Sequence, residues 1–488
     1  MNLYLIGHDY RYAAEQMLLT LFPDERPEYP DGRPTGDRAE LRLMSGTKVT
    51  TVTCVLVYQG RTANGRTSVP NGELTDPAEK DRRLQGAVKR AFYRAAMGIG
   101  LPHRPWGMLT GVRPGKLMTP LLAQGLNDAQ AARQFERQYD VSPARADLVV
   151  RTAHATLRAM ESLGSKDVCL YVGIPFCPTR CAYCSFVSQS VEKSMALVPE
   201  FLQALAREIA ATAEAVRRAG LRVVSLYIGG GTPTTLSARQ LDALCTQLAA
   251  AFDLSALREF TVEAGRPDTI TADKLQVLRA HRVDRISVNP QTLDDRVLDT
   301  IGRRHTAQDI YDALRLVRET GGFAVNMDLI AGLPGDTPDG FRATLEQVLA
   351  LAPENVTVHT LSRKRGSNLM AQDAPIPDGA AVGEMLDFAG TVLPRAGYAP
   401  YYLYRQKFMS GGFENVGWTR PGQENLYNIC IMEELCSILA MGGGASTKLV
   451  RPNGGRLERH IDPKYPTEYI ANIDRICAAK AELEAFFQ

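Results

Sequence analysis

The sequence lacks the features that mark membrane, secreted and nucleic-acid-binding proteins. No apolar run approaches the roughly 20 residues that a membrane-spanning helix needs. The first ten residues do not join a basic segment to an apolar one, as a signal peptide does. The 56 basic and 54 acidic residues give a net charge of only +2, too little for broad binding to nucleic acid or to an anionic membrane. We therefore expect a cytoplasmic protein with no integral membrane segment and no nucleic-acid partner.

Nor does the chain carry the cysteine pattern of a disulfide framework. It has nine cysteines, an odd number in 488 residues, of which six are scattered and three are clustered. Disulfide-stapled chains are short and carry paired cysteines. A reducing compartment and one metal site fit this pattern better.

What is present predicts an α/β protein of about three domains, at roughly 150 residues per domain. Residues 1–165 mix short strands with helices, which predicts an N-terminal α+β domain with a helical linker. In residues 166–375 strands alternate with amphipathic helices, which predicts a parallel sheet curling into a partial (β/α)6 barrel. Residues 376–488 lose this alternation and predict a mixed C-terminal domain that covers the barrel mouth, with a helix near 430–439. The predicted barrel strands are 169–175, 223–228, 259–263, 285–288, 324–330 and 356–361.

Directly after the first barrel strand stands a C-x3-C-x2-C motif, formed by Cys177, Cys181 and Cys184. Barrel enzymes carry their sites at the C-terminal ends of the strands. Thiolates hold iron–sulfur clusters, and a full set is four. Three thiolates therefore leave one iron open to a cofactor or substrate.

Two other interpretations of this motif stay open, namely chance spacing and structural zinc. Structural zinc needs four closed ligands, and no histidine lies between His154 and His281. Cys169, upstream on the same strand, is more typical of a buried strand residue than of a ligand.

A second motif, Gly229-Gly230-Gly231-Thr232-Pro233, follows the next barrel strand. Three glycines let a ligand approach the backbone closely and expose N–H groups to it. The motif is neither a Walker loop nor G-x-G-x-x-G. Alone it would indicate a tight turn, but one βα unit after the cysteine motif it indicates a ligand site.

Together these motifs resemble the oxygen-independent coproporphyrinogen III oxidase family of radical S-adenosylmethionine (SAM) proteins. The resemblance covers residues from about 166 to 450 and continues in TVEA at 261–264, NPQ at 289–291, IGR at 301–303 and DLIAGLP at 328–334. Three further segments resemble the HemZ branch in particular: GHDYRY at 7–12, GVRP at 111–114 and YYLYRQK at 401–407.

The resemblance implies a [4Fe-4S] cluster on Cys177, Cys181 and Cys184, with SAM on the fourth iron. It places Tyr171 beside the cluster and the sulfonium, as a catalytic residue that also contacts the cofactor. An acid suits an ammonium or ribose hydroxyls, and an arginine suits a carboxylate. We expect the polar contacts at successive strand ends. The implied SAM-binding residues are Tyr171, Tyr183, Gly230, Gly231, Thr232, Glu263, Gln291, Arg303 and Asp328.

The implied activity is that of a SAM-dependent oxidoreductase of porphyrin and haem biosynthesis. A 5′-deoxyadenosyl radical would take a hydrogen from a propionate of coproporphyrinogen III, and loss of carbon dioxide and an electron would leave a vinyl group, leading to protoporphyrinogen IX. A low-potential donor such as flavodoxin or ferredoxin would supply electrons. The propionates would need cationic partners. The candidates are basic residues that would fit a solvent-exposed face at least as well: Arg363, Lys364, Arg365, Arg405 and Lys407.

Two positions depart from the oxidase pattern. Phe186 stands where that type has a fourth cysteine, and Gly173 stands where it has a histidine. The C-x-F ending is typical of the HemW haem-chaperone branch. Two alternatives therefore stand beside the oxidase, a haem-binding and haem-delivery protein and radical chemistry on another tetrapyrrole. His359 is the nearest axial-ligand candidate, although packed strand histidines are commoner.

Overall fold

The computed structural model describes residues 1–32, 34–184, 189–190, 194–362, 375–406, 410–451 and 457–487. Chain contacts divide it into two compact units. One comprises Met1–Val112 and Gly125–Asp147, and the other comprises Arg113–Gln124 and Leu148–Gln488. The division into three domains stays a prediction. No helix among the described residues is both long and apolar enough to cross a membrane.

The first unit is built on a four-stranded sheet in the order β1-β2-β3-β4. Only β1 and β2 are parallel. Helix α2 begins at an Asp76 cap, whose carboxylate accepts from the Glu79 N–H, and it packs across the sheet. The elements are β1 (Asn2–Ile6), α1 (Arg11–Leu21), β2 (Arg38–Ser45), β3 (Val49–Tyr58), β4 (Arg61–Pro70), α2 (Pro77–Gly98) and α4 (Asp128–Tyr139).

Strand β4 has no counterpart in the sequence prediction, because its residues are mostly polar. A two-residue turn at Gln59 and Gly60 joins β4 to β3. Both residues have a positive φ, which is the turn geometry that suits twisted antiparallel strands. Within it Gly65 lies against helix α2, where a Cβ would stand 1.9 Å from the carbonyl oxygen of Ala91. Turn geometry and helix packing, rather than hydrophobic alternation, therefore define this strand.

The second unit contains an eleven-stranded sheet that runs, in the described part of the chain, from β13 at one edge to β17 at the other. Its seven central strands are all parallel. All six predicted barrel strands are present, which confirms the α/β fold. In sheet order the central strands are β12 (Asn355–Thr360), β11 (Ala324–Ala331), β10 (Arg285–Ser287), β9 (Glu259–Glu263), β8 (Arg222–Gly230), β5 (Asp167–Ile174) and β15 (Ser437–Gly442).

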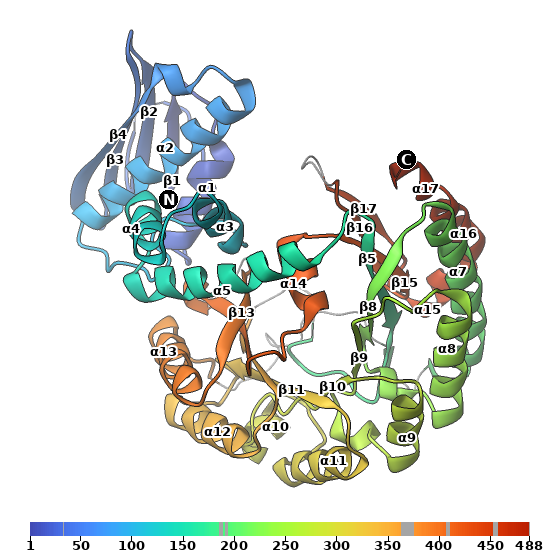
Figure 1. Ribbon diagram of the computed structural model, residues 1–488. Coiled ribbons are helices and arrows are strands. Elements are labelled where there is room, and N and C mark those ends of the chain that lie inside the picture. The colour runs from blue at the N-terminus through green and yellow to red at the C-terminus, as the bar shows by residue number, and fades with distance from the viewer. Residues whose placement is uncertain are drawn as a thin grey trace. The chain divides into compact units, whose positions relative to one another are not determined.

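Figure 1 shows the connecting helices on the outside of this curved sheet. Strands covered on both faces are buried along their whole length, as β10 is. The carboxyl ends of the strands therefore meet at one rim, where the loops that carry chemistry lie. The helices of the second unit before residue 400 are α3 (Gly115–Ala123), α5 (Pro143–Ser162, which begins in the first unit), α7 (Val198–Arg218), α8 (Ala238–Ala251), α9 (Ala272–Ala280), α10 (Asp295–Thr300), α11 (Ala307–Thr320), α12 (Pro338–Ala350) and α13 (Gly379–Arg395).

Strand β15 corrects the expectation of a helix near 430–439. The helix there, α14 (Leu426–Glu433), ends because Glu434 takes a left-handed conformation with φ 57°. The chain then forms β15 beside β5. A short apolar run does not by periodicity alone distinguish a buried strand from a buried helix. The other elements after residue 398 are β13 (Ala399–Arg405), β14 (Glu414–Thr419), β16 (Ser446–Leu449), β17 (Glu458–Ile461), α15 (Pro466–Ala471), α16 (Ile473–Ala481) and α17 (Glu484–Phe487).

A buried ionic group joins α16 to α7. The Nζ atom of Lys480 lies 2.9 Å from Oε1 of Glu208 and 3.4 Å from Oδ2 of Asp462. Glu208 also accepts from the N–H of Gly442 at 2.8 Å. Removing one member of such a group leaves a buried charge without its partner, at a cost of about 3–5 kcal/mol. The chain's last helices are thus tied to the parallel sheet.

Two basic residues, one in the GVRP segment and one just after it, share an acidic partner. Both Arg113 and Lys116 form ion pairs with Glu434, just beyond α14. Gly115 fits beside Glu433, where a Cβ would stand 2.6 Å from Oε1. This segment therefore anchors the end of α14 within the second unit.

Candidate functional site

The cysteine motif lies in the loop beyond the carboxyl end of β5. Cys177 ends the short strand β6 (Phe176–Cys177), which pairs with β7 (Gln189–Ser190). The loop is held to the segment after α10 by a hydrogen bond from the Ala182 N–H to the Ile301 carbonyl at 3.0 Å. These contacts bring the cysteine loop to the rim formed by β8, β9 and β10.

A cavity of about 120 Å³ opens at this rim. All three motif cysteines line it, together with most of the predicted cofactor-binding residues. Gln291, Asp328 and Tyr171 are not among the lining residues. The lining consists of Cys177, Thr179, Cys181, Tyr183, Cys184, Gly230, Gly231, Thr232, Glu263, Gly265, Arg266, Asn289 and Arg303.

The glycine motif brings the backbone of β8 against its neighbours. At Gly229 a Cβ would stand 2.9 Å from both the carboxyl carbon of Glu263 and the ring of Tyr227. At Gly231 it would stand 2.5 Å from the carbonyl oxygen of Phe176, and Gly230 has a φ of 107°. Side chains at these positions would displace the groups that line the cavity, so glycine is required here on steric grounds.

Glu263 is a buried acid with two hydrogen-bond donors. The Tyr227 hydroxyl donates to its Oε1 at 2.7 Å, and the Gly230 N–H donates to its Oε2 at 3.3 Å. Burial raises the pKa of Glu263 to about 7 despite the opposing hydrogen bond from Tyr227. An acid in this state gains from a cationic ligand, which restores the carboxylate.

Arg303 follows helix α10 and reaches the cavity from there, whereas we expected it at a strand end. Its Nη1 donates to the Asn289 carbonyl at 2.7 Å, and its Nε is a buried donor with no hydrogen-bond acceptor among the described residues. Burial opposes the charge, but Tyr183 and the Cys181 thiol outweigh it, so the pKa of Arg303 is raised. A buried cation with an unused donor suits a carboxylate ligand.

Gln291 and Asp328 stand behind the cavity. The Gln291 N–H donates to the Asp328 carbonyl at 2.9 Å, and Gln291 has a left-handed φ of 67°. The Asp328 carboxylate accepts from Asn289 Nδ2 at 2.8 Å and lies 3.8 Å from Nε2 of His359. Burial would raise the pKa of Asp328, but the nearby His359 and the hydrogen bond from Asn326 outweigh it and the pKa is lowered. Asp328 therefore fixes Asn289, which does line the cavity.

Comparison with known proteins identifies this rim. Residues 171–348 match the radical SAM superfamily. The chain is 39% identical over 389 residues to the oxygen-independent coproporphyrinogen-III oxidase-like protein HemZ of Bacillus subtilis, covering 78% of each chain. It is 30% identical to the haem chaperone HemW of Lactococcus lactis, covering 64% of this chain and 78% of that one. In structure it is similar to the radical SAM enzyme coproporphyrinogen III oxidase (HemN) of Escherichia coli, with a TM-score of 0.51 and 25% identity over 66% of this chain and 72% of that chain.

The chain belongs to the HemN-like family of radical SAM proteins.

The cavity fits the two cofactors of a radical SAM protein, a [4Fe-4S] cluster and SAM. Three thiols around one cavity supply three of the four ligands that such a cluster needs. The buried acid Glu263 suits a cationic group, and the unused donor of Arg303 suits an anionic one. The amino-acid part of SAM carries both, an ammonium and a carboxylate. The glycine motif leaves backbone exposed between them.

Arg266 and Asn289 are cavity residues to which sequence reasoning assigned no role. Arg266 is 4% exposed, and its Nη1 lies 3.6 Å from Sγ of Cys181 while its Nη2 donates to the Thr179 hydroxyl at 2.9 Å. If Cys181 holds a cluster, a guanidinium at this distance is one of the groups by which a protein sets the cluster's reduction potential. Its only sequence signal was its place three residues after Glu263, beyond the end of β9.

In the radical SAM fold of this chain, Tyr171 lies in an aromatic stack next to the cavity. Its ring lies 6.1 Å from that of Tyr227 and 6.0 Å from that of Tyr427, and the rings of Tyr227 and Tyr427 lie 4.4 Å apart. Burial raises the pKa of Tyr171. Through Tyr227, which donates to Glu263, this stack supports the acid.

The expected propionate partners fall into two groups. Arg405 is buried, its guanidinium donates to the Gly412 carbonyl at 2.6 Å, and burial lowers its pKa to about 10. It therefore braces the turn at 410–412. The sequence had suggested either a partner for a propionate or a solvated residue, and neither interpretation predicted this role. Outside the described residues lie Phe186, Arg363, Lys364, Arg365 and Lys407.

Proposed function

We propose that this radical SAM protein catalyses the oxygen-independent oxidative decarboxylation of coproporphyrinogen III, converting propionates to vinyl groups. The observation that carries the proposal is the cavity in which three thiols face the glycine motif, Glu263 and Arg303. The 39% identity to a coproporphyrinogen-III oxidase-like protein over most of the chain supports the substrate. A low-potential donor of the flavodoxin or ferredoxin kind would supply the electrons.

The chain's own part in this chemistry is to hold and orient. When bound, a reduced cluster with SAM supplies a 5′-deoxyadenosyl radical, which abstracts hydrogen. We propose that Cys177, Cys181 and Cys184 hold the cluster, and that Glu263 and Arg303 bind the charged ends of SAM. Asp328 accepts a hydrogen bond from Asn289, and Tyr227 donates one to Glu263. These hydrogen bonds hold the two cavity side chains in position before SAM binds.

The structure explains why position 173 is a glycine in this chain. A Cβ there would stand 3.0 Å from the Gly443 carbonyl oxygen and 3.3 Å from the ring of Tyr171. The path of the chain after β15 thus occupies the space that a histidine would need. We propose that other groups handle the substrate at this point.

Haem binding and delivery is the second candidate function. It is supported by the 30% identity to a haem chaperone and by the absence of a histidine at position 173. His359, the expected axial ligand, is already engaged. Its Nδ1 lies 3.4 Å from the Tyr404 hydroxyl and its Nε2 lies 3.8 Å from Asp328. This engagement favours the oxidase over a His359-ligated haem.

The test is one anaerobic reaction with reconstituted protein, SAM, a strong reductant, cell extract as electron acceptor and coproporphyrinogen III. Mass spectrometry follows the tetrapyrrole and 5′-deoxyadenosine together. Loss of one or two carbon dioxides in step with 5′-deoxyadenosine is the expected result. The Cys181→Ala variant is the control and should give neither product.

Two results would overturn the proposal. An unchanged tetrapyrrole without 5′-deoxyadenosine, combined with tight haem binding in an absorption titration, would assign the carrier function. An unchanged tetrapyrrole with accumulating 5′-deoxyadenosine would assign radical chemistry on a different tetrapyrrole.

A further inference from the structure

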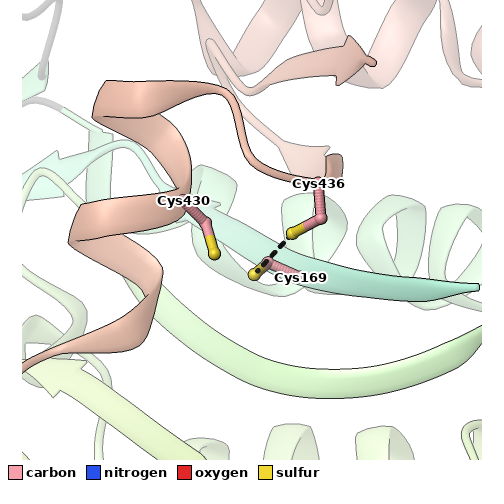
Figure 2. A group of neighbouring side chains, drawn as sticks. All are labelled: Cys169, Cys430 and Cys436. Carbon is pink, nitrogen blue, oxygen red and sulfur yellow. Dashed lines mark hydrogen bonds between the residues drawn. The ribbon is translucent and has the colours of Figure 1, made fainter. Parts of the chain in front are cut away.

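A second group of cysteines lies away from the cofactor cavity. The Sγ atoms of Cys169, Cys430 and Cys436 all lie within 4.8 Å of one another, and all three side chains are buried. Figure 2 shows them converging from strand β5, helix α14 and the residue before strand β15. We name them the three-thiol group.

We propose that the three-thiol group binds a single soft metal ion, and that the ion is Cu(I). The site is distinct from the cluster site. Cys169 lies near the amino end of β5, whereas the cysteine motif follows its carboxyl end. Cys169 and Ile174 are five residues apart on this strand, about 16 Å at roughly 3.3 Å per residue.

The spacing of the sulfurs fits one ion. Three sulfurs at about 2.3 Å from a central d10 ion in a trigonal plane stand about 4 Å apart. The sulfurs of Cys169 and Cys436 are 3.6 Å apart, and the whole group lies within 4.8 Å. Small shifts of the side chains therefore close a trigonal site, while a four-iron cluster is too large for the gap.

The ligand set favours Cu(I) over zinc. Structural zinc takes four ligands, and open zinc sites fill the fourth place with water. In the described part of the chain, no fourth His, Cys, Asp or Glu joins this group. Apolar and aromatic side chains pack around the group, among them Val224, Leu426 and Ile438. Soft thiolates suit Cu(I), and three of them can complete its shell without the fourth ligand that zinc takes.

An acid lies near the three-thiol group but does not join it as a ligand. The neighbouring acid Glu259 is held elsewhere, because its carboxylate accepts from the N–H groups of Leu426 and Tyr427 at 2.8 Å and 3.2 Å. It thereby caps α14, the helix that carries Cys430, and supplies no ligand.

The experiment counts copper in full-length protein with the cluster ligands removed. The parent is the triple variant Cys177→Ala, Cys181→Ala, Cys184→Ala, purified anaerobically, so that any bound metal belongs to another site. Cu(I) is supplied from a chelator of known affinity, and the bound copper is measured by mass spectrometry. We expect one copper per chain, with a sulfur-only shell in X-ray absorption.

Two additional substitutions in this parent test the assignment. Cys430→Ala should weaken Cu(I) binding by at least about tenfold, the lower end of what loss of even a supporting group costs a metal site. Cys245→Ala is the matched control, because Cys245 is equally buried but lies in α8. It should leave copper binding unchanged. Circular dichroism of both variants checks that they fold like the parent.

Four results would overturn the proposal. These are equal loss of copper in both variants, nitrogen or oxygen in the copper shell, displacement of stoichiometric copper by zinc, and a Cys169–Cys436 disulfide in the anaerobic protein. None of them bears on SAM cleavage, so the test is independent of the proposed function.

Discussion

The two cysteine groups of this protein use the same residue type in opposite surroundings. The motif cysteines lie in one loop, eight residues from first to last, and line a cavity with polar and charged neighbours. The three-thiol group is assembled from segments up to 267 residues apart and is buried among apolar side chains such as those of Val224 and Ile438. The comparison teaches that an open position for chemistry requires a loop at the strand ends. A closed site can form inside the sheet from residues that packing brings together.

An aromatic stack lies between these two groups. Tyr171 is two residues from Cys169 on β5, and Tyr427 precedes Cys430 by three residues on α14. Tyr227 completes the stack and donates to Glu263 at the cavity. Changes on one side of the stack can therefore be used to ask whether the other side responds.

The largest expected effect is at the open group. Cys181→Ala removes one of the three proposed cluster ligands, so we expect loss of the iron–sulfur cluster and of SAM cleavage. Iron content, absorption and 5′-deoxyadenosine measure this loss. Cys245→Ala, an equally buried cysteine outside both groups, should retain all three. An intact cluster in the Cys181 variant would contradict the ligand assignment.

A smaller effect is expected at the glycine motif. In Gly229→Ala the new Cβ would stand 2.9 Å from Glu263 and Tyr227. Overpacking of this kind costs about 1–3 kcal/mol, so SAM should bind about 10- to 100-fold more weakly while the iron content stays the same. Calorimetry with the reconstituted protein measures the affinity. Gly390→Ala is the control, because a Cβ there has open space.

The place of the open group could be predicted because local patterns encode it. Alternation of strands and helices predicted all six barrel strands, and the spacing of Cys177, Cys181 and Cys184 predicted a shared site, which the cavity that they line confirms. Their role as cluster ligands stays a prediction. Glu263 follows the same logic, since it ends strand β9. Arg303 was expected at a strand end, but it reaches the cavity from the turn after α10, which no strand pattern encodes.

The closed group could not be predicted, because its members are brought together only by tertiary packing. Cys169 was correctly expected to be buried, but its neighbours Cys430 and Cys436 depend on the end of α14 and the start of β15. An apolar run had been expected to continue the helix there. The left-handed Glu434 ends the helix and turns Cys436 back toward Cys169.

The pH dependence of SAM binding is expected to be moderate. Burial raises the pKa of Glu263 to about 7. SAM's ammonium prefers the carboxylate, so affinity should rise as pH increases through about 7, by at most about tenfold per pH unit. Without SAM, raising the pH has the opposite effect: it lowers the stability of the folded protein. The neutral acid is the form better suited to burial, so its contribution to stability is full below 4.5 and is lost as pH rises through about 7.

The measurement is the SAM dissociation constant one pH unit below and one above this value. The control is Glu263→Gln, which cannot titrate and should bind SAM weakly with a flat profile. A slope that persists in the glutamine variant would show that another group controls binding.

The smallest effect is expected from Tyr171→Phe, at the stack between the two groups. The contacts that the structure shows for Tyr171 are made by its ring, at 6.1 Å from Tyr227 and 6.0 Å from Tyr427. Phenylalanine keeps these contacts, each worth about 0.5–1.5 kcal/mol. SAM affinity and 5′-deoxyadenosine formation should therefore change by less than about twofold. Tyr171→Ala removes the ring and should weaken SAM binding by about tenfold, because Tyr227 then loses the neighbour that positions its hydroxyl against Glu263. A large loss in the phenylalanine variant would instead assign the hydroxyl a direct part in the reaction, as the resemblance to the oxidase family implied, and would make Tyr171 a catalytic residue rather than a positioning one.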